Sequence, residues 1–343
     1  MRKLRVLTAV HDVLVPPPNA DELPASETWD YQMELDVVRT LQALGHEVTV
    51  LGVGEELRPV RDAIAEQKPH VVFNILSDFH DVVTYEAHFV SFLELCKQPY
   101  TGCNPRGITL AGDKALSKQI LAWHRIPVPA FAVFPLRSKR TKLPRKMAFP
   151  VIVKSAVQHG SAGIAQASVV HNDKELAERV EFLHRTLQTD VVVEQFLAGR
   201  EFTVSVLGNE RLEAFPIWEL WFDKLPEGNE SIATSRVKWD ERYQRRVGLR
   251  TGRARELGAE VEQRIHAIAK RTYRALHLSG YARIDLRMDE QGRVYVIEAN
   301  VNNDLTPGED FPESAQSVGV DYGQLLQRIL NTGLAYKPAW KID

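Results

Sequence analysis

Two alternating segments near the C-terminal end of the chain constrain its fold more than any other feature. In Tyr281–Met288, and again in Arg293–Asn300, residues of contrasting polarity alternate as they do in β-strands. The polar stretch Asp289–Gly292 between them is typical of a hairpin loop. We therefore expect a β-hairpin here.

The register of this hairpin decides which polar side chains share a face. With a loop of two or four residues, Arg283 lies opposite Glu298 and Asp285 lies opposite Val296. Because side chains alternate with a period of two, the polar residues then project from one face, whereas an odd loop would break the arrangement. These residues are Arg283, Asp285, Glu298 and Asn300.

That face carries the ligand chemistry of a hard metal ion. The carboxylates of Asp285 and Glu298 and the amide oxygen of Asn300 make an all-oxygen site. Magnesium prefers such ligands and usually completes its shell with water and nucleotide phosphates. The alternative explanation is a solvated hairpin face with a salt bridge, and the hairpin alone leaves both open.

Length and composition indicate an ordinary globular protein of several subdomains. The chain has 343 residues, of which 44% are hydrophobic and 26% charged. Its 43 Lys and Arg against 45 Asp and Glu give a net charge of −2, which offers no support for nucleic acid or membrane binding. Cys96 and Cys103 show neither metal-ligand spacing nor a disulfide framework. With no secretion signal, we expect a cytoplasmic protein that acts on small molecules, with a homodimer left open.

The order of the expected elements divides the chain into three units. Strands alternate with helices over residues 1–108, which indicates a parallel α/β domain. A second unit covers residues 109–190, and a third, residues 191–343, contains the hairpin. Within the third unit, residues 223–255 carry seven arginines and two lysines with little apolar periodicity. We expect this segment to be a loop that becomes ordered on binding.

A lysine beside a glycine-rich loop predicts a phosphate-binding site. Lys154 ends an apolar stretch and stands just before a loop that contains Gly160, Ser161 and Gly163. Glycines let backbone N–H groups approach an anion, and the lysine adds a positive charge. The alternative is an edge-strand lysine before a surface turn. No Walker P-loop pattern is present, and no Gly-x-Gly-x-x-Gly follows the first strand.

Further residues fit a nucleotide less specifically. Glu194 ends the apolar run Val191–Val193 at a junction where exposed backbone groups can read an adenine edge, and Glu201 can accept hydrogen bonds from ribose hydroxyls. The alternative is a turn with two solvated acids. Lys114 and Lys118 lie four residues apart on an expected helix, and we expect Lys118 on a solvated face.

Taken in order, these stretches resemble the ATP-grasp superfamily, specifically its D-alanine–D-alanine ligase-like branch. The likeness covers nearly the whole chain, and the ordered set is specific although each piece alone is weak. The matching stretches are Phe73–Asn74, Pro99–Gly102, Gly112–Lys114 with Lys118, Ile126–Pro129, Pro150–Lys154 with the glycine loop, Val193–Val204, Val237–Trp239, Gly280–Asp285 and Ile297–Asn300.

The resemblance implies a fold and a role for each matching residue. The fold would be an N-terminal parallel α/β domain followed by two α+β lobes that grip ATP. The implied phosphate contacts are Lys114, Lys154, Lys238 and the loop of Gly160, Ser161 and Gly163. The implied adenine contacts are Glu194, Gln195, Phe196 and Leu197, with Glu201 at the ribose. The implied ligands of two magnesium or manganese ions are Asp285, Glu298 and Asn300, and the implied catalytic residues are Arg283 and Lys238.

The departures from the family pattern concern the substrates. After the first strand, the region His11–Asn19 is longer than the family segment that holds the first substrate's amine. A count without gaps puts Asp304 at a family glycine, and Glu309 at the serine that binds the second substrate's carboxylate. Together with Asn302 they form the expected acceptor pocket, and two acids there would repel a carboxylate. Alternatively, both acids point to solvent or pair with arginines of residues 242–255.

We therefore predict an ATP-dependent carboxylate–amine ligase with an acceptor other than D-alanine. The resemblance implies that it forms an amide through an acyl phosphate and releases ADP and phosphate. Two alternatives stay open. One is a true D-alanine–D-alanine ligase with a rebuilt acceptor pocket, and the other is a nucleotide-binding regulator on the same fold, without turnover.

Overall fold

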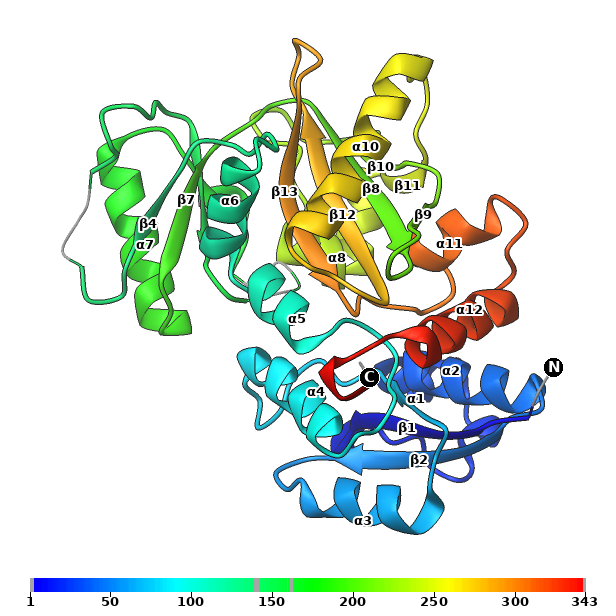
Figure 1. Ribbon diagram of the computed structural model, residues 1–343. Coiled ribbons are helices and arrows are strands. Elements are labelled where there is room, and N and C mark those ends of the chain that lie inside the picture. The colour runs from blue at the N-terminus through cyan, green and yellow to red at the C-terminus, as the bar shows by residue number, and fades with distance from the viewer. Residues whose placement is uncertain (1–2, 139–141, 159, 161–162, 342–343) are drawn as a thin grey trace.

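The computed structural model describes residues 3–138, 142–158, 160 and 163–341. Its strands form three sheets that follow one another along the chain, with helices packed between and beside them (Figure 1). This mixture of sheets and helices confirms the α/β fold class. Within the described residues, no helix is both long and apolar enough to cross a membrane.

The first sheet is parallel, as the alternation of strands and helices predicted. β1 (Arg5–His11) lies in the middle of the order β2-β1-β3, between β2 (Glu47–Val53) and β3 (Val71–Asn74). The helices of this part of the chain are α1 (Ala25–Thr28), α2 (Gln32–Ala43), α3 (Arg58–Gln67) and α4 (Glu86–Leu95).

A helix from far along the chain completes this first unit. α12 (Tyr322–Ala335) packs beside α2 on one side of the sheet, while α3 lies on the other (Figure 1). Leu326 and Ile329 of α12 belong to the same buried cluster as Val6 and Phe73 of the sheet. One face of the N-terminal sheet is therefore covered by the C-terminal part of the chain.

The second sheet is antiparallel, with the order β4-β7-β5-β6. One face packs against α7 through apolar residues such as Val153 and Val180. The other face carries Lys154 and Glu194, which lie on neighbouring strands and alternate with the α7-facing residues. Its elements are β4 (Phe131–Phe134), β5 (Val151–Ser155), β6 (Val169–Val170), α7 (Asp173–Leu187) and β7 (Val191–Gln195). We had expected β7 to begin the third unit, but it pairs with β4 and β5, so this sheet extends to residue 195.

Two short helices connect the first sheet to the second, α5 (Pro105–Gly112) and α6 (Lys114–Trp123). Asp113 begins α6, because its Oδ1 accepts hydrogen bonds from the N–H groups of Ala115 and Leu116, both at 2.9 Å. α6 lies between β7 of the second sheet and β13 (Figure 1). This position directs Lys114 and Lys118, one turn apart, toward both lobes.

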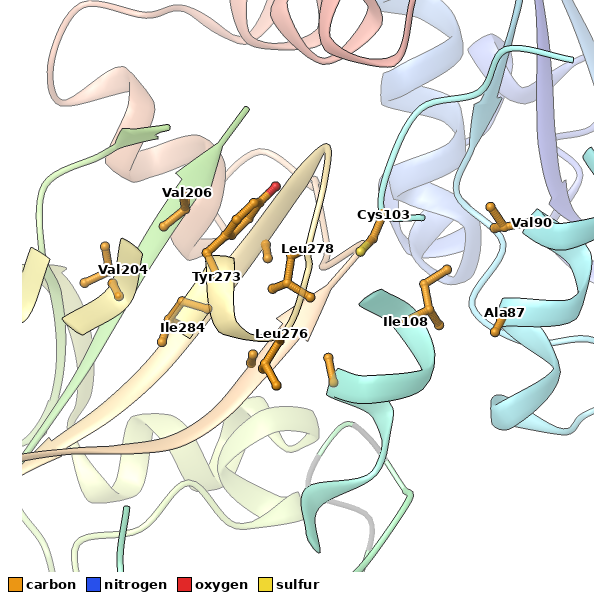
Figure 2. Close-up of a cluster of buried hydrophobic side chains, with 14 of the residues drawn as sticks. Ala87, Val90, Cys103, Ile108, Val204, Val206, Tyr273, Leu276, Leu278 and Ile284 are labelled. Carbon is orange, nitrogen blue, oxygen red and sulfur yellow. The ribbon is translucent and has the colours of Figure 1, made fainter. Parts of the chain in front are cut away.

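The third sheet has the order β11-β10-β8-β12-β13, with β9 paired to β8. α10 packs on one face, where Tyr273 meets Val204 and Ile284, and the same cluster continues past Ile108 to Val90 of α4 (Figure 2). The elements are β8 (Arg200–Leu207), β9 (Glu213–Ala214), β10 (Trp218–Phe222), β11 (Leu249–Arg253), α10 (Ala259–Ala275), β12 (Tyr281–Met288), β13 (Val294–Val301) and α11 (Asp310–Gln316).

The predicted hairpin is present, but the predicted register is wrong. Met288 pairs with Val294, so the loop holds residues 289–293, an odd number. The register then shifts between Asp285 and Leu286, where β13 contains one extra residue, a β-bulge at Ile297. The bulge compensates for the odd loop, so the polar residues still share one face. Arg283 pairs with Asn300 and Asp285 with Glu298.

Residues 223–255 are not the irregular loop that we expected. They contain α8 (Ser235–Trp239), α9 (Glu241–Val247) and the edge strand β11. Thr234 and Asp240 cap the two helices by accepting N–H bonds from Val237 and Tyr243 at 3.3 and 2.9 Å. The capping residues could have indicated the start of each helix from the sequence. The buried apolar residues of the two helices, however, are too few to show a helical periodicity.

Candidate functional site

The polar face of the hairpin holds a connected group of side chains. Arg283 Nε donates to Asp285 Oδ1 at 2.8 Å, and its Nη2 donates to Oδ2 at 3.1 Å. Asn300 Nδ2 donates to the same Oδ2 at 2.9 Å. The structure therefore brings the expected catalytic arginine into contact with an expected metal ligand.

The oxygen atoms on this face fit a divalent metal ion. Asp285 and Glu298 lie opposite each other on adjacent strands. Burial raises the pKa of Asp285, Arg283 opposes this, and Glu298 raises it again, with a net rise. A cation shared by the two carboxylates and the amide oxygen of Asn300 would relieve their repulsion, and magnesium or manganese suits these donors.

Asp310, which sequence reasoning missed, adds an acid on the other side of Arg283. Its Oδ2 lies 3.8 Å from Arg283 Nη1 and accepts a hydrogen bond from Thr203 Oγ1 at 3.3 Å. Burial lowers the pKa of Arg283, but the surrounding carboxylates, Asp285 first, raise it well above its ordinary value. The guanidinium is therefore a fixed positive charge.

Two of the three lysines expected at the phosphates, Lys114 and Lys154, are buried beside acids. Lys114 Nζ lies 3.4 Å from Glu298 Oε2 and donates to the carbonyl of Gln158 at 2.7 Å. Lys154 Nζ lies 3.4 Å from Glu194 Oε2. We call Lys114, Lys154, Glu194 and Glu298 the nucleotide end of the site. Its charges come from the second sheet, α6 and the hairpin.

The prediction that Lys118 lies on a solvated face is wrong. Its side chain is 1% exposed, and its Nζ lies 3.4 Å from Glu194 Oε1. The same ammonium donates to the carbonyl of the bulge residue Ile297. The sequence spacing places Lys118 on the same side of α6 as Lys114, but it does not show that two lobes meet on that side.

The segment expected at the adenine uses part of its backbone internally. The N–H of Gln195 donates to the carbonyl of Ala130 at 2.7 Å, and the N–H of Phe196 donates to Pro150 at 3.1 Å. These two donors are therefore committed to the fold. Adenine recognition by this segment would have to use other groups, such as the N–H of Leu197.

Arg287 contacts the segment that follows β7, beside the expected ribose contact Glu201. Its Nη1 donates to the carbonyl of Leu197 at 2.9 Å, and its Nη2 donates to Ser231 and lies 3.4 Å from Glu201 Oε2. Sequence reasoning missed Arg287, although it lies on the polar face of β12, two residues after Asp285. Through these contacts Arg287 connects Leu197, Glu201 and the segment 223–255.

The glycine loop adopts backbone conformations that favour glycine. Gly160 and Gly163 have φ angles of +66° and +70°. Arg179 of α7 donates to the carbonyl of Gly163. Ser161, the third loop residue that we singled out, lies outside the described residues.

The segment 223–255 reaches the glycine loop in this structure. Trp239 Nε1 donates to the carbonyl of Gly160 at 3.2 Å. Lys238, the preceding residue, lies close enough to Asp285 to lower the pKa of its carboxyl. The expected catalytic lysine therefore lies near Asp285, one of the expected metal ligands.

Three acids gather at the far side of the hairpin, and we call them the acceptor end. Asp304 Oδ1 accepts hydrogen bonds from the N–H and Oγ1 of Thr306, at 2.8 and 2.6 Å. Glu309 stands at the start of α11, and burial, Asp304 and then Asp310 raise its pKa. Asp304 and Glu309 are both exposed, as the alternative of solvent-facing acids expected. Among the described residues, neither of them forms an ion pair with the arginines of 242–255.

The third acid, Glu34 of α2, was not predicted. Glu34 is 2% exposed. Burial, with a further contribution from Asp304, raises the pKa of its carboxyl to about 7. No ion pair of Glu34 exists within the described part of the chain. Glu34 belongs to the first unit, and no pattern in the sequence indicates that this unit lies beside the residues that follow the hairpin.

Asn302, expected in the acceptor pocket, contacts the first unit through both atoms of its side-chain amide. Its Oδ1 accepts the N–H of Cys103 at 2.8 Å, and its Nδ2 donates to Glu86 at 2.6 Å. A side chain at Gly102 would meet the Asn302 amide oxygen at 2.3 Å, so glycine is required for this close approach. Asn302 therefore joins the third sheet to the first unit.

A further group with metal-ligand chemistry lies at the carboxyl edge of the first sheet. His11 Nε2 is 3.6 Å from Asp78 Oδ1 and 3.9 Å from Asp81 Oδ1. His11 is the last residue of β1 and the first residue of the region His11–Asn19, in which the sequence departs from the family pattern. Ligands of parallel sheets bind at this edge.

Comparison with known proteins bears on these features. The sequence model of the family described as "D-ala D-ala ligase C-terminus" matches residues 120–331. A D-alanine–D-alanine ligase of Gloeobacter violaceus is 30% identical over 303 residues, which cover 87% of this chain and 92% of that protein. An uncharacterised protein of Sinorhizobium fredii, y4sG, is 27% identical over 300 residues, which cover 86% and 85%. The solved D-alanine–D-alanine ligase of Bacillus anthracis has a TM-score of 0.74 at 22% identity, over 96% of this chain and 97% of that one.

Proposed function

Because the chain belongs to the D-alanine–D-alanine ligase-like family of ATP-grasp enzymes, which form carbon–nitrogen bonds, we propose that it couples ATP cleavage to the joining of a carboxylate and an amine. The observation that carries this proposal is the meeting of Arg283, Asp285 and Glu298 with two buried lysines in one site. A regulator that only bound a nucleotide would need the lysines, but it would have no use for Arg283.

In the proposed reaction, a carboxylate oxygen attacks the γ-phosphorus of ATP and the bond to ADP breaks. The amine nitrogen then attacks the acyl carbon, phosphate leaves, and the amine loses a proton as the amide forms. A metal held by Asp285, Glu298 and Asn300, with two ions as the family pattern implies, would neutralise phosphate charge when bound.

The chain's own charged residues have separable tasks in this scheme. Lys114 and Lys154 bind phosphate oxygens that carry charge before and after transfer. Arg283, held in place by Asp285, stabilises charge that develops only during acyl transfer. Lys238 and Trp239 close over the glycine loop and exclude water that would hydrolyse the acyl phosphate.

We also propose that the acceptor carries no carboxylate beside its reacting amine, and that a second positive group fits. Glu34, Asp304 and Glu309 place three acids at the acceptor end, and none of them forms an ion pair among the described residues. Burial and the neighbouring acids raise the pKa of Glu309 more than Arg283 and Lys238 lower it. A like-charge contact at ~4 Å costs about 1 kcal/mol in water and several times more near a protein surface. An amino acid acceptor would bring its carboxylate into this field.

The test is to measure ADP release with matched acceptors, an amino acid and its decarboxylated amine, such as lysine and cadaverine. The wild type should prefer the amine, and the double variant Asp304→Gly, Glu309→Ser should lose that preference. Glu290→Ser, an exposed acid in the hairpin loop, is the matched control and should keep it. Preference of the wild type for the free amino acid would refute the acceptor class, and D-alanine as the best acceptor would indicate a dipeptide ligase.

A further inference from the structure

Glu194 lies inside the protein between two lysines. Its side chain is 1% exposed, with Lys118 Nζ 3.4 Å from Oε1 and Lys154 Nζ 3.4 Å from Oε2. Burial raises the pKa of Glu194, but the two lysines outweigh burial and hold it below its ordinary value. A carboxylate buried this deeply is strongly disfavoured without a cation beside it.

The two lysines are held differently. Lys118 has a second acceptor, the carbonyl of Ile297, which lies in the bulge of β13. Lys154 has Glu194 as its one polar partner among the described residues, and its side chain is 10% exposed. Lys118 is therefore fixed at two points, whereas Lys154 is free to exchange its single partner for another.

The pair of Lys114 and Glu298 shows why Glu194 needs a second cation. When Lys114 leaves Glu298 to bind a phosphate, Glu298 can bind a divalent metal instead, because Glu298 shares a face with Asp285. Glu194 lies on the second sheet, away from that face, and has no metal to receive it. Only a resident cation can keep it neutralised when Lys154 leaves.

We propose that Lys118 is a positioning residue that compensates Glu194 permanently, so that Lys154 can exchange Glu194 for a phosphate of the nucleotide. This inference rests on the proposed function, since it requires a phosphate at Lys154. Lys118 itself touches no phosphate. It acts through Glu194, and the Ile297 carbonyl keeps its ammonium in place during the exchange.

The test compares equilibrium binding of Mg-ADP to the wild type, Lys118→Met and the double variant Lys118→Met, Glu194→Gln. In Lys118→Met, Lys154 is the sole counter-ion of Glu194, so the dissociation constant should rise on the order of 10- to 100-fold. In the double variant no carboxylate holds Lys154, and the constant should return to within about threefold of the wild type. Lys118→Arg, which keeps the charge, should bind nearly as the wild type does.

A merely structural role for Lys118 predicts no such rescue, because the double variant removes a second buried group. Double-variant binding as weak as that of Lys118→Met would overturn the inference. If Lys118→Met does not fold, the double variant, which has no uncompensated charge, is compared with the wild type directly, and binding more than about tenfold weaker overturns it. A wild type that binds no Mg-ADP would instead refute the proposed function.

Discussion

The two ends of the candidate site treat charge in opposite ways. At the nucleotide end, each of the two acids has a cation beside it: Glu298 has Lys114, and Glu194 has both Lys118 and Lys154. This end of the site is therefore nearly neutral. It is nevertheless built from charges of both signs, which can separate when a ligand arrives.

The acceptor end keeps its acids without such partners. Among the described residues, Glu34, Asp304 and Glu309 form no ion pair, and burial and mutual repulsion raise the pKa of Glu34 and Glu309. A ligand with both signs of charge, such as a metal nucleotide, suits paired residues that can exchange partners. Unpaired acids suit a ligand that brings positive charge. The pairing of charges therefore distinguishes the two binding tasks that we propose.

The largest effect that would sharpen this contrast is expected from Arg283→Ala. Losing one preorganised donor costs on the order of 10²–10³ in turnover, because Arg283 meets charge that develops during transfer. The dissociation constant of Mg-ATP should change much less. Turnover and nucleotide binding are measured in parallel. The control is Arg253→Ala, which removes an exposed arginine. Equal losses in both quantities would contradict the division of roles between arginine and lysines.

Lys154→Ala should have the next largest effect, and on binding rather than on the chemical step. A hydrogen bond to a charged group contributes about 1.5–3 kcal/mol, so the Mg-ATP dissociation constant should rise roughly 10- to 100-fold. Calorimetric titration measures it. Lys174→Ala, an exposed lysine of the same unit, serves as the control. An unchanged constant for Lys154→Ala would remove Lys154 from the nucleotide end.

The smallest effect concerns the acceptor end and depends on pH. Burial raises the pKa of Glu34 from 4.5 to about 7 in the folded protein. The unfolded chain therefore loses this proton at lower pH, and the contribution of Glu34 to stability falls as the pH rises from about 4.5 through about 7. Glu34→Gln should remove that fall and stabilise the protein at pH 8 by on the order of 1 kcal/mol.

Urea denaturation at pH 5 and pH 8 measures the change in the free energy of unfolding. Glu290→Gln, an exposed acid, should leave the pH dependence as it is in the wild type. If Glu34→Gln shows the wild-type slope, Glu34 is not a protonated buried acid, and the acceptor end carries one more negative charge than its pKa implies.

The sequence was sufficient for the hairpin face because alternation fixes which side chains lie together. It was insufficient for the register, since an odd loop and a bulge at Ile297 leave the same pattern of faces. It also could not assign Lys118, Glu34 and Asp310. Lys118 and Glu34 acquire their roles from contacts between units, whereas Asp310 acquires its role from Arg283 on another element of the third unit. Local patterns contain no information about which distant segments meet.

The covering of the first sheet by α12 has a consequence for synthesis on the ribosome. Chains emerge from the N-terminus, and domains generally fold in that order. Here α2 supplies Val37 and Leu41 early, but the rest of the cluster over Val6 and Phe73 is missing until Leu326 and Ile329 have been made. The first sheet of the nascent chain is therefore only partly covered until one of the last helices is synthesised, and in that interval its exposed apolar surface would be a binding site for chaperones.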